Sequence, residues 1–195
     1  MLKKKLPIII ALITVLNIGI YFTATYLESP DRVFAECARN SGRTSAAINL
    51  ILLVFIGLFG LKKIYRDKVK LGVFQSLILS FTMNHLIHFF FVYQNFSGQK
   101  MKLGILENLH GFITFVCIIL VPFIILTSKK LTNILYFFIL LHLFNVTYFI
   151  SISFYARYKP GEDEAYLHRL GILTMILMLF YVVFRVYRER LVNKD

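Results

Sequence analysis

Six apolar runs divide the sequence, and each is close to the roughly 20 residues that a helix needs to cross a bilayer. Short polar segments rich in Lys and Arg separate them. The runs occupy residues 6–27, 44–61, 71–94, 106–128, 131–158 and 167–187. Inside a bilayer a backbone must satisfy its own hydrogen bonds, so isolated runs of this length predict helices. The sequence therefore predicts an all-α, polytopic membrane protein: a six-transmembrane-helix bundle forming a single integral membrane domain over residues 1–195.

The composition excludes an ordinary soluble domain. Hydrophobic residues make up 58% of the 195 residues, and a soluble domain of this length does not bury so much apolar surface. The net charge is +12, but the basic residues form short clusters between the apolar runs. Such clusters are typical of cytoplasmic loops, and they do not form the basic stripe of a nucleic-acid-binding protein. Cys37 and Cys117 form no CxxC motif and predict no disulfide.

The distribution of positive charge predicts the orientation. Fourteen of the 22 Lys and Arg residues precede the first run, follow the second or fourth run, or lie in the last turn of the sixth run and the tail after it. Because the side with more Lys and Arg stays inside, we expect both termini to be cytoplasmic. The first run follows three lysines at positions 3–5, as a secretory signal peptide does. It is long for a signal and no small-residue cleavage site ends it, so we expect a retained helix; cleavage would leave five.

Histidines at membrane depth are the chemically most informative residues. His85 and His88 lie one turn apart in run 71–94, and His142 lies in run 131–158. At about 1.5 Å per residue, His85 and His142 lie roughly 21 and 17 Å from the cytoplasmic ends of their helices. The two are therefore near one level, at the midplane or slightly outward. An ionisable side chain at this depth usually faces the bundle interior and indicates a functional site.

Imidazole is a common axial ligand of haem iron. We therefore expect His85 and His142 to hold one haem b between the third and fifth predicted helices, with His88 as the alternate to His85. His110 and His168, nearer the outer side, are further alternate ligands. The polar residues expected to support the imidazoles are Thr82, Asn84, Asn145 and Thr147. The alternative is that these histidines and asparagines only hold helices together.

No other catalytic motif accompanies the histidines. The sequence contains no Gly-rich phosphate loop, no HExxH and no GxSxG. It also has no nucleotide-binding portion. If the chain moves electrons, it is an oxidoreductase subunit whose donor and acceptor are other molecules, such as a redox partner protein or a quinone.

Three stretches resemble the ferric-reductase-like transmembrane domain family, and within it the haem-binding membrane subunits of periplasmic methionine sulfoxide reductase systems. SGRTSAAINLILLVFIGLFGLKK at 41–63 is similar to that family's Gly-Arg-led second helix. KLGVFQSLILSFTMNHLIHFF at 70–90 resembles its histidine-bearing third helix. FIILTSKKLTNILYFFILLH at 123–142 resembles its Thr-Ser hairpin followed by Leu-His in the fifth helix. The likeness spans residues 42–158.

The resemblance implies a haem b electron-transfer subunit in a bacterial cytoplasmic (inner) membrane, passing electrons outward to a periplasmic partner. That family commonly has a second histidine about four turns further along its fifth helix. Here those positions are Tyr155 and Ala156, so at most one haem is expected. The alternative function is a cofactor-free membrane scaffold, partner subunit or small-molecule carrier.

Overall fold

The computed structural model describes residues 2–99, 109–156 and 165–191, and within these residues every regular element is an α-helix. The helices are α1 (Leu2–Leu27), α2 (Val33–Phe59), α3 (Leu61–Arg66), α4 (Lys68–Gly98), α5 (Leu109–Thr127), α6 (Asn133–Ala156) and α7 (Ala165–Leu191). The all-α prediction is confirmed. By length and composition, five of them could cross a membrane: α1, α2, α4, α6 and α7. The apolar part of α5 within the described residues, Gly111–Thr127, is shorter.

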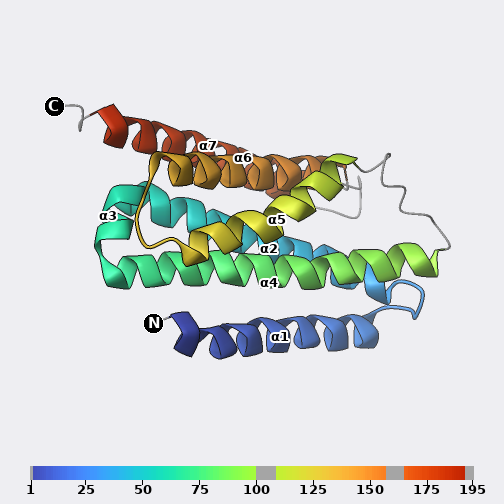
Figure 1. The fold of residues 1–195 in the computed structure, drawn as a ribbon. Coiled ribbons are helices and arrows are strands. Elements are labelled where there is room, and N and C mark those ends of the chain that lie inside the picture. The colour runs from blue at the N-terminus through green and yellow to red at the C-terminus, as the bar shows by residue number, and fades with distance from the viewer. Residues whose placement is uncertain (1, 100–108, 157–164, 192–195) are drawn as a thin grey trace.

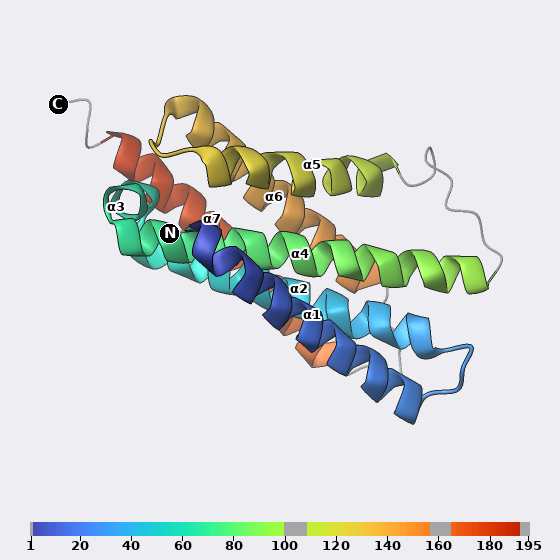
Figure 2. The ribbon, with the colours of Figure 1, turned by 60° about the horizontal axis from the view of Figure 1, so that its bottom comes forward.

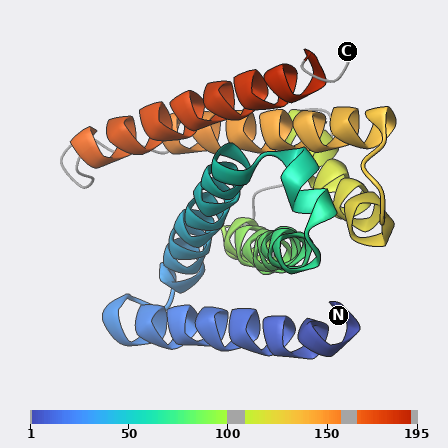
Figure 3. The ribbon, with the colours of Figure 1, turned by 90° about the vertical axis from the view of Figure 1, so that its left-hand side faces the viewer.

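The helices form three layers, with α2 and α4 in the middle (Figures 1 and 3). On one side α1 packs against both of them and lies across them in Figure 2. On the other side α6 and α7 lie side by side, and α5 packs against α4 and α6. Large apolar side chains cover the outward surfaces; Phe22, Phe123 and Phe180 are each more than 60% exposed. An outward surface of this kind is what lipid contact requires, so the protein has the character of an integral membrane protein.

Successive long helices run in opposite directions. As a result α1 begins and α7 ends at the same end of the molecule, where α3 also lies (Figure 1). We call this the α3 end. The starts of α2 and α7 lie at the opposite end.

The boundaries of α2 differ most from the prediction. Residues 33–43, predicted as part of a loop, are helical, and α2 begins at Val33 instead of Thr44. The polar side chains there pair within the helix: Arg39 with Glu36 at 3.1 Å, and Asn40 with Glu36 at 2.8 Å. Their opposite face, with Cys37 and Ala38, is buried. The apolar length of a run therefore underestimates the length of a helix whose polar end is amphipathic.

The remaining boundaries agree to within a few residues, with one addition. The predicted loop after the second run contains the short α3. Residues 106–108 and 157–158, predicted as helical, lie outside the described part of the chain.

Two residues define the α2–α3–α4 connection. Gly60 has φ of 72°, and a Cβ built there would lie 1.7 Å from Glu189 Oε1 of α7, so the turn requires glycine. Asp67 caps α4: its Oδ1 accepts hydrogen bonds from the backbone N–H groups of Val69 (2.9 Å) and Lys70 (3.1 Å). The side-chain hydrogen bond from Lys70, together with these backbone bonds, lowers the pKa of the Asp67 carboxyl.

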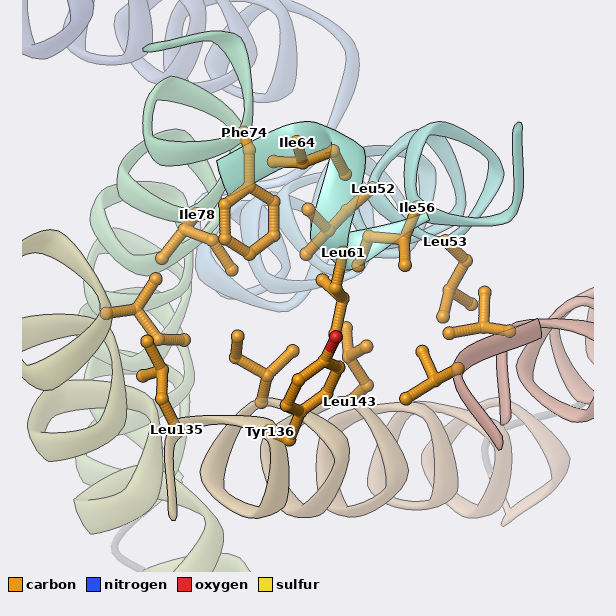
Figure 4. Packing of buried hydrophobic residues seen from close by; sticks show 14 of the residues in the cluster. Leu52, Leu53, Ile56, Leu61, Ile64, Phe74, Ile78, Leu135, Tyr136 and Leu143 are labelled. Carbon is orange, nitrogen blue, oxygen red and sulfur yellow. The ribbon is translucent and has the colours of Figure 1, made fainter. Parts of the chain in front are cut away.

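The apolar core fills the half of the bundle nearest the α3 end. Side chains from α2, α3, α4 and α6 converge there, as Figure 4 shows for Ile56, Leu61, Phe74 and Leu143. All four are fully buried. The buried polar side chains lie toward the other half, and the candidate site is there.

Candidate functional site

His85 and His88 of α4 face α2, and a serine of α2 contacts each. Ser45 Oγ lies 3.3 Å from His85 Nδ1, and Ser41 Oγ lies 3.0 Å from His88 Nδ1. Both imidazoles and both serines are buried. The centroids of the two imidazole rings are 5.1 Å apart. The serines, one turn apart on α2, thus fix the orientation of histidines one turn apart on α4.

The hydrogen bonds of Ser41 assign the tautomer of His88. Ser41 Oγ donates to the carbonyl oxygen of Cys37 at 2.7 Å, so it accepts from His88 Nδ1–H. His88 Nε2 then carries the lone pair. A metal-ligating histidine typically has this arrangement, in which one ring nitrogen donates to a supporting acceptor and the other coordinates. Ser45 Oγ contacts His85 Nδ1 in a geometry that suits either tautomer.

Asn84 connects three helices beside these histidines. Its Nδ2 donates to the Ser41 carbonyl oxygen (2.9 Å) and to Ser45 Oγ (2.8 Å) of α2. Its Oδ1 accepts from Asn17 Nδ2 of α1 at 2.9 Å. The Asn84 side chain has no exposed surface. This network holds the two serines in place, so it supports the histidines through them.

A cavity of about 420 Å³ lies between α2, α4, α6 and α7. We call it the histidine cavity. Its lining combines three histidines, two arginines, three phenylalanines and small or polar residues: Ala35, Ala38, Arg39, Gly42, Arg43, His85, His88, Val92, Asn95, Phe96, Phe149, Ile150, Ser153, Phe154 and His168. Its volume is within the ~300–1,000 Å³ of small-molecule and cofactor sites, which also combine apolar walls with a few polar groups.

Gly42 leaves space in the wall of the cavity. A Cβ built on Gly42 would lie 3.2 Å from Cε1 of His88, closer than ordinary van der Waals contact. Glycine therefore lets the His88 ring lie directly against the backbone of α2. Opposite α4, His168 of α7 lies against Phe154, with 5.6 Å between the ring centroids. The cavity thus brings together imidazoles from two helices that are distant in the sequence.

The predicted pair His85 and His142 is arranged differently. His142 is buried, with 1% of its surface exposed, but it does not line the histidine cavity. Phe81 contacts both imidazoles: it stacks on His85 at 5.4 Å and meets His142 edge-on at 6.2 Å between ring centroids. In the described part of the chain, His142 Nδ1 has no hydrogen-bond partner. The side chain of His110 lies outside the described part of the structure.

Of the four predicted supporting residues, Asn84 is connected to a histidine through Ser45. The other three bind elsewhere. Thr82 donates to the carbonyl oxygens of Ile78 and Ile118. Thr147 Oγ1 accepts from Asn49 Nδ2 at 3.1 Å, and Asn145 Oδ1 accepts from Thr114 Oγ1 at 3.3 Å. These bonds connect α6 to α2 and α5.

Sequence reasoning missed Ser41, Gly42, Ser45 and the two arginines as parts of the site. Residues 28–43 were predicted as a loop, which placed Ser41, Gly42 and both arginines away from the third predicted helix, whereas Ser45 lay in the predicted second helix. The small residues Cys37, Ser41 and Ser45 recur every four positions, and small residues at that spacing indicate close helix packing in membranes. That signal could have identified the α2–α4 contact.

The donor set suits haem better than a bare metal ion. Within the described residues, no three His, Cys, Asp or Glu side chains gather as a metal site. A structural or catalytic zinc needs three or four protein ligands, whereas haem iron needs one or two axial ones. Imidazoles from α4 and α7 line one aromatic-walled cavity with Arg39 and Arg43, so they are the candidate ligands for a haem iron.

No protein-family model, curated protein or solved structure matches the chain.

Proposed function

We propose that the chain is a membrane electron-transfer subunit that binds a single haem b in the histidine cavity. The observation that carries the proposal is the convergence of His85, His88 and His168 on one cavity between α2, α4, α6 and α7. A bound haem supplies one-electron redox chemistry. The electron donor and acceptor are other molecules, a quinone or a redox partner protein.

His88 and His168 are the residues that would hold the haem iron in the histidine cavity. Ser41 holds His88 in the tautomer with a lone pair on Nε2, and His168 is in the cavity wall contributed by α7. Arg39 and Arg43 would bind carboxylates at the cavity, as arginines do through paired N–H groups. Phe96, Phe149 and Phe154 keep water from the walls. Ligation of the haem by His85 and His142 stays a prediction, and it differs from this proposal in the variants that should lose haem.

An absorption spectrum of the purified protein, expressed with haem supplied, tests the proposal. We expect a Soret band, and loss of most of the haem in His88→Ala and in His168→Ala, because each removes an axial bond. His142→Ala is the matched control, since it removes a buried imidazole that does not line the cavity. Haem content is measured as the ratio of Soret to protein absorbance.

Two results would count against the proposal. If His142→Ala loses haem and His168→Ala retains it, the haem binds at the site predicted from the sequence, between α4 and α6. Absence of a Soret band in the wild-type protein would show that the protein binds no haem. The alternative would then be a cofactor-free scaffold, partner subunit or small-molecule carrier, and the aromatic walls of the histidine cavity favour a carrier of an apolar molecule.

We also propose that α5 completes a sixth span and that both termini are cytoplasmic. The alternating helix directions support an even number of crossings (Figure 1). The α3 end carries the clusters of Lys and Arg after α2 and along the last turns of α7, which favours its cytoplasmic placement in a bacterial inner membrane. The histidine cavity is then in the outer half of the bilayer.

A further inference from the structure

A second cavity, of about 400 Å³, lies at the α3 end. The end of α2, helix α3 and the last turns of α7 form it. Its lining residues are Phe59, Lys62, Lys63, Arg66, Arg185, Arg188 and Glu189. We call it the basic pocket. Five of its seven residues are basic and one is acidic, and none of them lines the histidine cavity.

Within the described residues, most of this positive charge is not paired with a carboxylate. Lys62 contacts Glu189 through its backbone N–H, 3.3 Å from Oε2, and through Nζ to the Glu189 carbonyl oxygen. Lys63, Arg66, Arg185 and Arg188 form no ion pair with a carboxylate in the described part of the chain. Four cations from α3 and α7 thus line one pocket together with a single described carboxylate, that of Glu189. Like charges brought so close repel each other, and a bound anion would relieve this repulsion.

Arg185 gives an independent indication of a ligand. Its Nε is buried and has no hydrogen-bond partner among the described residues, although buried donors in folded proteins are nearly always satisfied. An anion in the pocket would supply the missing acceptor. Arginine also binds phosphate oxygens through several parallel N–H groups.

The backbone holds the pocket in shape. The Gly60 turn brings the carboxylate of Glu189 against the start of α3, and the Lys62 backbone N–H binds that carboxylate. Helix α3 is thereby fixed beside α7. The basic side chains of the two helices are presented together because of this contact.

The position of the pocket indicates the source of the anion. Tyr181, Phe184 and Tyr187 of α7 are exposed large side chains beside the pocket residues of that helix, and α7 is long and apolar enough to cross a membrane. A ligand with a phosphate at the pocket could lay hydrocarbon along this surface. Basic pockets between membrane helices at the cytoplasmic side commonly bind anionic lipid headgroups.

We propose that the basic pocket binds a phosphate group, and that an acidic phospholipid supplies it. The site is independent of haem binding. Removing one basic side chain near a lipid surface weakens anionic lipid binding about fivefold, so removing two should weaken it roughly 25-fold.

The test uses the full chain in a neutral detergent, titrated with phosphatidylglycerol, with phosphatidylcholine or with inorganic phosphate. The readouts are the midpoint of thermal unfolding and the mass of lipid retained in native mass spectrometry. We expect phosphatidylglycerol to raise the midpoint and to remain bound, with no comparable effect of phosphatidylcholine. In Arg66→Gln/Arg185→Gln the apparent affinity for phosphatidylglycerol should fall roughly 25-fold.

Arg190→Gln is the matched control, because Arg190 is at the same end of α7 but contacts Tyr136 and Asn133 instead of lining the pocket. Lys63→Gln, at an exposed position, is the milder second variant and should show about a fivefold loss. Equal effects of the control and the pocket variants would overturn the site, as would equal effects of the two lipids. If inorganic phosphate alone reproduces the shift, the phosphate site stands and the lipid is overturned as its source.

Discussion

Asn84 shows how a single residue organises the buried polar half of the bundle. Its amide makes three hydrogen bonds, to Asn17 of α1 and to Ser41 and Ser45 of α2. An apolar side chain of similar shape would leave the Ser41 carbonyl oxygen and the Asn17 amide without these partners. In an apolar surrounding, unpartnered polar groups are unfavourable.

We therefore expect Asn84→Ala to lower the free energy of unfolding by about 2 kcal/mol, since a hydrogen bond between membrane helices contributes about 0.6 kcal/mol on average and up to about 1.7. The measurement is equilibrium unfolding in mixed micelles. Asn40→Ala, which removes a half-buried amide bonded to Glu36, is the control and should lose only about 0.6 kcal/mol. Similar losses in the two variants would show that the network contributes little.

Single residues also show what the sequence could and could not predict. The burial of His85, His88 and His142 was expected from their depth in apolar runs and is confirmed. Which of them share a cavity was not predictable, because that depends on how each helix is rotated about its axis. Run 71–94 is apolar on nearly all sides, so its pattern does not fix that rotation. The packing of Gly42 against His88 fixes it in the structure.

At the scale of elements, the polar segments were predicted less well than the apolar ones. Six apolar runs were predicted as helices, and each is helical over its described length except for short stretches at the ends. The helical residues 33–43 were missed because the transmembrane criterion counts apolar length only, while this segment is stabilised by pairs such as Arg39 with Glu36.

Capping by Asp67 makes the stability of the first turn of α4 depend on pH. The pKa of Asp67 is lowered, chiefly by the hydrogen bond from Lys70 and then by the backbone bonds. A carboxyl whose pKa is lower in the folded state stabilises that state above its unfolded pKa of about 3.9, and this contribution is lost as the pH falls through the folded pKa. The first turn of α4 should therefore loosen only in acid.

We expect faster hydrogen exchange of the Val69 and Lys70 amides, relative to the Asp67→Asn protein, as the pH falls from about 5 to about 2. Asparagine keeps an oxygen that accepts from the same N–H groups but does not titrate. The comparison at each pH removes the intrinsic pH dependence of exchange. An identical pH profile in the two proteins would contradict a role for the ionised carboxylate.

For the whole molecule, orientation is the property that remains a prediction. A green fluorescent protein fused after Asp195 should fluoresce, since we expect the C-terminus to be cytoplasmic and this reporter matures there. Alkaline phosphatase at the same position should be inactive. An active phosphatase fusion with a non-fluorescent protein fusion would show that the orientation is reversed or that there is one span fewer. The mass of the intact protein would then show whether the first helix had been cleaved.

The structure of α4 has a consequence for how the protein enters the membrane. It is the least apolar of the five helices that are long enough to cross, and Asn84, His85 and His88 lie within it. A translocon inserts such a segment less readily than a uniformly apolar one. The polar partners of Asn84 and the two histidines described above belong to α1 and α2, which the ribosome completes first. The order of synthesis therefore favours insertion of α4, because the helices that carry its hydrogen-bonding partners are already in the bilayer when it enters.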